Sequence, residues 1–255
     1  MTPLFETMQG ATPLLIHMPH AGRLIPDGFD RTRLADPDAF DRACELTRDR
    51  HADDLGLMLA DRLDATVMVN HVNRMWCDPE RYPDDREEMN RVGMGAIPVR
   101  DTDGHPLYLP GMDPGMRERG RRFRLLYTPW HRMLDTACLT MLDTWGRCTI
   151  IDTHTYPRAP PPYELHKDEP RPQAIIGHNG DLAGMALATR LASLLLGRGL
   201  TVGVNTAHKG SMIPDTIRDT RLASIMVEAR WDTAADPKAR TMVADAIGHA
   251  VRGRL

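Results

Sequence analysis

Short apolar segments alternate with longer amphipathic segments along most of this 255-residue chain. The short segments are typical of buried strands, whereas the longer ones repeat their leucines and alanines at helical spacing. This alternation constrains the fold, because strands joined through helices form a mixed, mostly parallel sheet with helices on both faces. We therefore expect an α/β fold in a single domain over residues 1–255.

The expected elements can be given as residue ranges. Strands are predicted at 13–19, 65–72, 148–153, 174–177, 201–205 and 223–229. Helices are predicted at 38–63, 116–145 (which Pro129 could interrupt), 181–197 and 237–251. Residues 77–115 are rich in proline, glycine and aspartate and should be irregular, and so long an irregular stretch in a compact domain is usually functional.

Composition excludes several classes of protein. The 32 Lys and Arg nearly balance the 35 Asp and Glu, which argues against a general nucleic-acid binder. No apolar run approaches the roughly 20 residues that span a bilayer, and the first residues lack the features of a secretory signal. The four cysteines are widely spaced, as in reduced proteins. We expect a cytoplasmic protein with neither a nucleic-acid nor a membrane partner, and the sequence gives no indication of its oligomeric state.

Polar residues stand at the ends of three predicted strands. His20 follows the first, Asp152 and His154 end the third, and Glu228 interrupts the last. The carboxyl ends of parallel strands meet at one edge of a sheet, where such folds place their sites. Each residue also has a structural explanation: a hydrogen-bonded turn, a satisfied pair, or, for Glu228, an ion pair with Arg230.

Two histidines and one carboxylate would make a catalytic zinc site with an open position for water. Asp152 could orient the imidazole of His154, since metal-bound histidines usually donate their second N–H to a carboxylate or carbonyl. The HExxH motif is absent, and residues 45–54 are the richest source of a carboxylate ligand. Asp49 and Asp53, four residues apart, are expected on one helical face.

Arginines at two positions could bind a substrate carboxylate. Arg74 follows the second strand, and Arg81 lies in the irregular stretch. The planar fork of arginine binds carboxylates in a bidentate manner, although most arginines in proteins are simply solvated.

Taken together, these segments resemble the N-formylglutamate amidohydrolase family, whose fold is similar to that of the zinc carboxypeptidases. Near the start, residues 19–22 with 25–26 resemble the family's PHSG segment and its following proline, 48–55 its TDxHVDxL helix, and 73–81 its SRxxxDxNR loop. Further on, residues 127–131 resemble YxPYH, 151–155 IDAHS, 204–210 VNxPYxGG, and 225–230 the terminal QxExxR-like strand. The seven segments occur in the family's order.

The resemblance implies a zinc ion, or another divalent ion, held by His20, Asp49 and His154, with Glu45 or Asp53 as alternatives to Asp49. Glu228 would deprotonate the water and protonate the leaving amine, and an arginine would stabilise the oxyanion. The substrate would contact Arg74, Arg81, His131 and Asn205. The implied activity is hydrolysis of a small N-acyl amide of an amino acid, such as N-formylglutamate.

Some positions depart from the family pattern. Ala21, Glu80, Ala207 and His208 replace a serine, an asparagine, a proline and a tyrosine. The acid at Glu80 would repel a dicarboxylate substrate unless its side chain points away. Two alternatives therefore stay open: a deacylase or peptidase of the same fold acting on a larger amide, and a non-catalytic binding protein.

Overall fold

The computed structural model describes residues 3–254, whose strands form one seven-stranded sheet in the order β1-β3-β2-β4-β7-β5-β6. β3, β2, β4 and β7 are parallel, β1 and the β5–β6 pair run antiparallel to their neighbours, and β5 and β6 are parallel to each other. The predicted mixed α/β sheet is therefore confirmed. The strands are β1 Phe5–Met8, β2 Leu14–Met18, β3 Thr66–Asn70, β4 Cys148–Tyr156, β5 Ala174–Gly177, β6 Val202–Val204 and β7 Leu222–Arg230.

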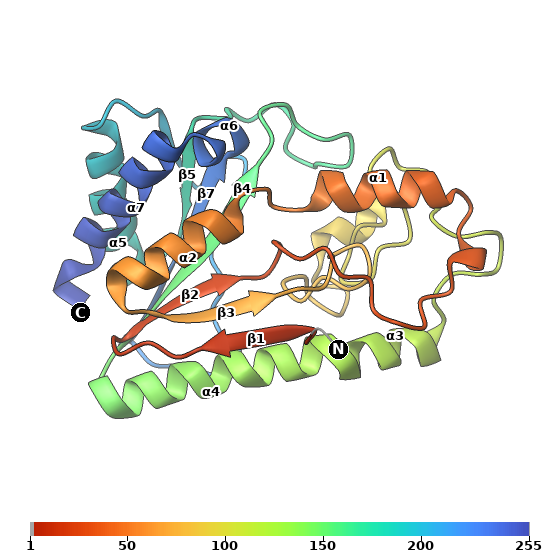
Figure 1. Ribbon diagram of the computed structural model, residues 1–255, viewed down its shortest axis with the longest axis horizontal. Coiled ribbons are helices and arrows are strands. Elements are labelled where there is room, and N and C mark those ends of the chain that lie inside the picture. The colour runs from red at the N-terminus through yellow and green to blue at the C-terminus, as the bar shows by residue number, and fades with distance from the viewer. Residues whose placement is uncertain (1–2, 255) are drawn as a thin grey trace.

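Helices cover both faces of this sheet (Figure 1). On one face lie α2 Ala52–Leu63, α5 Leu182–Leu196 and α7 Pro237–Val251, whose apolar side chains form one core cluster with Leu14 and Ile16 of β2. On the other lies α4 Thr128–Trp145, packed against Leu15 of the same strand. Successive side chains of a strand point to opposite faces, so a continuous apolar strand fills both layers of the core.

The remaining elements match the sequence predictions except at a few positions. β1 and the short helix α6 Trp231–Ala235 were not predicted. Helix α3 Met116–Arg122 runs through a π-helical turn, Phe123–Tyr127, into α4, where Pro129 lies in the first turn and causes no break. The rest of the described chain adds only three 3₁₀ turns: Arg31–Arg33, Glu88–Val92 and Arg252–Arg254. Since only Glu88–Val92 falls in the stretch predicted to be irregular, that prediction is confirmed.

The helix predicted over 38–63 is two helices, α1 Pro37–Thr47 and α2, separated by residues 48–51. His51 adopts a left-handed conformation (φ 65°), and the backbone N–H of Asp49 donates to the carbonyl of His20 at 3.1 Å. Asp49 therefore lies in a buried break, whereas Asp53 is exposed on α2. The expectation that Asp49 and Asp53 share a helical face is wrong.

The parallel order of β3, β2, β4 and β7 brings their carboxyl ends to one edge of the sheet, next to the irregular stretch that follows β3 (Figure 1). His20, His154 and Glu228 all lie towards this edge. None of the helices within residues 3–254 combines the length and the apolar character that crossing a bilayer requires.

Gly22 allows a close backbone approach that shapes the turn after β2. A Cβ atom there would lie 2.4 Å from the carbonyl carbon of His71 and 2.5 Å from the carbonyl oxygens of His71 and Val72. Gly22→Ala should lower the free energy of unfolding by about 1–3 kcal/mol in urea titrations, because backbone must move to admit the methyl group. As a control, Gly248→Ala in α7 should be neutral or stabilising, since its Cβ makes only ordinary contact with Leu63. An unchanged midpoint for Gly22→Ala would contradict this packing.

Candidate metal centre and active site

Two buried imidazoles face each other at the carboxyl edge of the sheet. The Nδ1 atoms of His20 and His154 are 3.3 Å apart. The Nε2 atom of His20 lies 2.8 Å from Asp78, and that of His154 lies 3.0 Å from Asp152. Because an ionised carboxylate only accepts, these contacts place a proton on each Nε2. The two Nδ1 atoms then face each other and the carboxylate of Asp49, an arrangement that needs a proton or a metal ion between them.

Asp49 completes a three-donor group with the two histidines. Its Oδ2 atom lies 2.9 Å from His154 Nδ1 and 3.9 Å from His20 Nδ1. Ligands bonded at about 2.0–2.1 Å to a tetrahedral ion are separated by roughly 3.3 Å, so the three atoms fit a zinc ion. The structure thus brings the three predicted ligands together, and it leaves Glu45 and Asp53 exposed on α1 and α2.

The charges around this group also suit a cation. Burial lowers the pKa of His154, but the negative charges of Glu80 and Asp152 outweigh burial and hold that pKa well above its ordinary value. Burial raises the pKa of Asp49, but the hydrogen bond and charge of His154 and the charges of His20 and Arg74 lower it on balance. Without a metal ion, His154 therefore favours its protonated form beside an ionised Asp49, and a bound metal ion would take the place of the proton on His154 Nδ1.

Asp152 is held from three sides, which makes it an effective positioning residue. Its Oδ1 atom lies 2.7 Å from Nδ1 of the fully buried His17, and its Oδ2 atom accepts the Met212 N–H at 2.8 Å. The prediction that Asp152 orients His154 is confirmed by the 3.0 Å contact between them. The part played by His17 was missed, since a single histidine inside an apolar strand carries no signal of its own.

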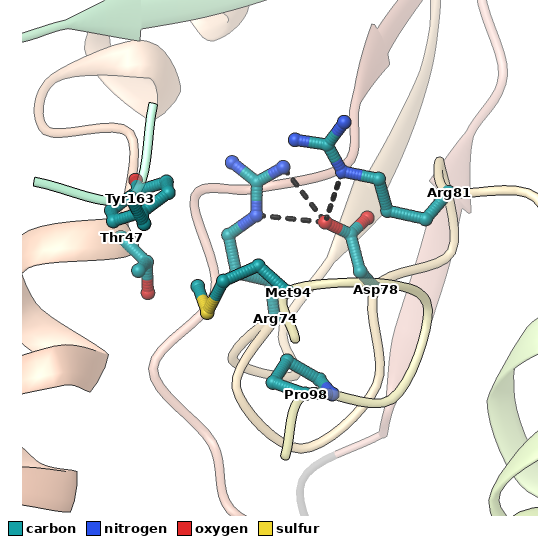
Figure 2. A pocket seen from close by; sticks show the side chains of 7 residues that line it. All are labelled: Thr47, Arg74, Asp78, Arg81, Met94, Pro98 and Tyr163. Atoms are coloured by element: carbon teal, nitrogen blue, oxygen red, sulfur yellow. Dashed lines mark hydrogen bonds and ion pairs between the residues drawn. The ribbon is translucent and has the colours of Figure 1, made fainter. Parts of the chain in front are cut away.

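Asp78 plays the matching part for His20, and two arginines converge on it (Figure 2). Nε and Nη2 of Arg74 lie 2.8 and 2.7 Å from Asp78 Oδ2, and Nε of Arg81 lies 3.6 Å from the same atom. Burial raises the pKa of Asp78, but Arg74, His20 and Arg81 hold it well below its usual range. These residues line a small recess together with Thr47, Met94, Pro98 and Tyr163.

The role of Asp78 was not predicted, although it stands within the segment that resembles the SRxxxDxNR loop. A carboxylate four residues after Arg74, in an irregular segment, was the available signal. The sequence could not show that this segment folds back over His20.

Glu228 reaches the same site from β7, where it is the register partner of His154 on β4. The structural alternative is not supported, because Arg230 pairs with Asp232 at 2.7 Å instead. Within residues 3–254, Oε2 of Glu228 has no hydrogen-bond partner, and His208 Nδ1 is 3.8 Å from Oε1. Burial raises the pKa of Glu228 to about 8; the charge of His154 opposes this effect, and Asp49 and Glu80 add to it. Such a carboxyl group can accept and return a proton near neutral pH.

Burial also lowers the pKa of His208 to about 3, and the nearby charges of Arg171 and His154 act in the same direction. The His208 ring packs edge-on against Tyr156, with ring centroids 5.2 Å apart. A neutral imidazole therefore stands beside Glu228 where the family pattern has a tyrosine.

A cavity of about 890 Å³ opens onto His20, Asp49, His154 and Glu228. His131 lines it while Nε2 of His131 contacts the Pro79 carbonyl at 2.8 Å. Asn205 (φ 48°) shapes a neighbouring loop, because its Oδ1 atom accepts the N–H groups of His178 and Gly210. Asn205 is not among the residues that line the cavity within the described chain, and its substrate contact stays a prediction.

Comparison with known proteins identifies relatives of this chain. The family model described as N-formylglutamate amidohydrolase matches residues 12–235. An N-formylglutamate deformylase from Pseudomonas aeruginosa is 30% identical over 217 residues, which cover 84% of this chain and 77% of the relative. One from Pseudomonas putida is 29% identical over 159 residues, which cover 61% and 56%. The crystal structure of N-formylglutamate amidohydrolase from Ralstonia eutropha JMP134 superposes with a TM-score of 0.78 at 21% identity, covering 99% of this chain and 98% of that one.

The raised pKa of Glu228 predicts a pH-dependent stability in metal-free protein. The unfolded chain ionises this group near pH 4.5 and the folded one near 8, so stability falls as pH rises between these values. Glu228→Gln removes this loss, and its thermal midpoint should exceed that of the wild type by a margin that grows up to about pH 8. The exposed Glu88→Gln should follow the wild type at every pH. A Glu228→Gln midpoint below that of the wild type at about pH 9 would contradict the assignment.

Proposed function

The chain belongs to the N-formylglutamate amidohydrolase family, whose members hydrolyse an amide bond, and from that premise we propose that it removes the formyl group of an N-formyl amino acid such as N-formylglutamate. The observation that carries this proposal is the pair of opposed imidazole Nδ1 atoms beside Glu228, whose Oε2 atom has no hydrogen-bond partner within residues 3–254. The four free cysteines are consistent with a cytoplasmic enzyme.

His20, Asp49 and His154 would hold a divalent metal ion, zinc in our proposal. When bound, such an ion polarises a carbonyl group and makes water a stronger acid. Asp78 and Asp152 orient the two imidazole rings, because each accepts a hydrogen bond from the Nε2 atom of one ring. The donor set of two histidines and one aspartate leaves an open position, as catalytic zinc sites do.

Glu228 is proposed as the general base and then the general acid. It would take a proton from the attacking water and return it to the amide nitrogen as the C–N bond breaks, so formate and a free amine leave. Burial suits this role, because it raises the pKa of Glu228 to about 8. A carboxyl group with a pKa near neutral pH can both accept and donate a proton.

Arg74, Arg81 and His131 would position the substrate. All three line the cavity, and both guanidinium groups already face a carboxylate, Asp78. Arg74 is the nearer to the proposed metal ligands, with Nη1 3.8 Å from Asp49, which favours contact with the developing oxyanion. Arg81 is proposed to bind a substrate carboxylate.

The size of the cavity favours a second candidate substrate class. About 890 Å³ lies near the upper end of the range for small-molecule sites and exceeds what an N-formyl amino acid fills. A deacylase or peptidase acting on a larger amide would use this volume with the same catalytic groups. The kcat/KM values for N-formyl amino acids, N-acetyl amino acids and dipeptides distinguish the two substrate classes. A preference for the N-formyl amino acids supports deformylation, and a preference for dipeptides supports the larger amide.

Removing the proposed base should abolish turnover while metal remains bound. Glu228→Gln should lower kcat by a factor of about 100 to 10,000, because the amide side chain cannot accept the proton. Metal content, measured by elemental analysis, should equal that of the wild type. Full activity at unchanged metal content would remove Glu228 from the mechanism.

Arg81 should govern affinity rather than the chemical step. Arg81→Lys keeps the charge but loses the planar fork, so the KM for N-formylglutamate should rise roughly tenfold or more with little change in kcat. Comparing N-formylglutamate with an N-formyl amino acid that has a neutral side chain shows which substrate carboxylate Arg81 binds. If Arg81→Lys raises the KM of both substrates equally, Arg81 binds the α-carboxylate that they share. An unchanged KM for both substrates would exclude Arg81 from substrate binding.

A further inference from the structure

Glu80 points towards the two histidines rather than away from them. Its Oε2 atom lies 3.4 Å from Nδ1 of His20, the metal-facing nitrogen of that ring, and its Oε1 atom lies 3.3 Å from Nε2 of His154, the nitrogen that also contacts Asp152. Its side chain is 19% exposed, at the border between the histidines and the cavity. His20, Glu80 and His154 thus form a cluster whose donor atoms are close enough to share one ion.

The backbone around Glu80 keeps its carboxylate in reach of this cluster. The N–H of Glu80 donates to Asp78 Oδ1 at 3.0 Å, and the same oxygen lies 2.8 Å from His20 Nε2. One carboxylate therefore fixes both the ring of His20 and the start of the segment that carries Glu80. The position of Glu80 follows from the same contacts that build the histidine pair.

The charges near Glu80 give it no partner other than this cluster. Arg81 turns towards Asp78 and Glu87, and Arg74 towards Asp78 and Asp49. In the described part of the chain, the ion pairs of Glu80 are with His20 and His154 alone. A partly buried carboxylate close to Asp152 is unfavourable by itself, and a divalent cation between the histidines would remove that cost.

We propose that Glu80 is a displaceable additional ligand of the metal ion, a proposal that rests on the metal site of the proposed function. With His20, Asp49 and His154 it supplies four protein donors, the number that closes a tetrahedral site. Two carboxylates also balance the charge of a divalent ion. The site then rests closed, and the Glu80 carboxylate must swing into the cavity before the position needed for reaction becomes free.

This arrangement makes Glu80 a determinant of substrate choice. A substrate must compete with the Glu80 carboxylate for the fourth coordination position of the metal ion. A substrate that coordinates weakly, or that is too small to fill the cavity, would leave Glu80 in that position. The asparagine of the family pattern carries no charge at this position, and a site with asparagine there would lack this competition.

The test measures metal affinity rather than turnover. Zn²⁺ affinity is obtained by chelator competition on the full chain for wild type, Glu80→Gln, Glu80→Asp and the control Glu88→Gln. Glu88 lines the same cavity, but its carboxylate pairs with His166. We expect Glu80→Gln to bind Zn²⁺ about 10- to 100-fold more weakly than wild type and Glu88→Gln to bind it equally well. Glu80→Asp, which keeps the charge but shortens the reach, should resemble Glu80→Gln.

A second readout reports whether the position is closed. Azide added to the Co²⁺-substituted protein changes the visible spectrum only where a coordination position can be taken. Azide should bind Glu80→Gln at least about tenfold more tightly than wild type, since no internal carboxylate competes. Circular dichroism of each metal-free variant verifies that it is folded.

The outcomes separate this proposal from the proposed function. Wild type and Glu80→Gln with the same Zn²⁺ and azide affinities would overturn the role of Glu80 and leave the metal site intact. A wild type that binds no divalent ion would overturn the metal site itself. Full Zn²⁺ affinity in Glu80→Asp, with loss in Glu80→Gln, would show that charge alone matters and would reject coordination.

Discussion

Two imidazole nitrogens facing each other at 3.3 Å in a buried region are the constraint on which the rest of this site depends. Asp78 and Asp152 each hold the opposite nitrogen of one ring and so direct the lone pairs inward. Such an arrangement is stable only with positive charge between the rings. The fully buried His17 and the paired Arg74 then follow as supports, because they in turn hold Asp152 and Asp78.

The fold produces this arrangement through parallel strands. β2, β4 and β7 are adjacent and end at one edge, so His20 and His154 meet there although they are more than a hundred positions apart in the chain. The break between α1 and α2 places Asp49 at the same edge of the sheet. There the backbone N–H of Asp49 donates to the carbonyl of His20, and this hydrogen bond connects the break to the turn after β2. The core that fixes the strands on both faces therefore also fixes the site.

Acidic side chains outnumber cations near the histidines, and this imbalance links structure to chemistry. Asp49, Asp78 and Asp152 stay ionised because imidazoles or guanidinium groups face them, whereas burial leaves Glu228 with a raised pKa. In the proposed mechanism the same kind of side chain thus serves in two ways: ionised carboxylates would hold a cation and its ligands, and a dry carboxyl group would transfer protons. The environment of each acid, rather than its type, separates the two roles.

The α/β class, most strands and helices, and the polar strand ends at His20, His154 and Glu228 follow from the amino-acid sequence alone, because alternation and periodicity are local properties. The motifs also placed Asp49 among the proposed metal ligands, although by way of a predicted helix that does not continue through that residue. The break in this helix depends on tertiary contacts, since no proline or glycine marks residues 48–51 and the break is stabilised by His20 and His154. The tertiary structure also determines where Asp78 and Glu80 point, because they lie in an irregular segment whose path is set by contacts with residues distant in the chain.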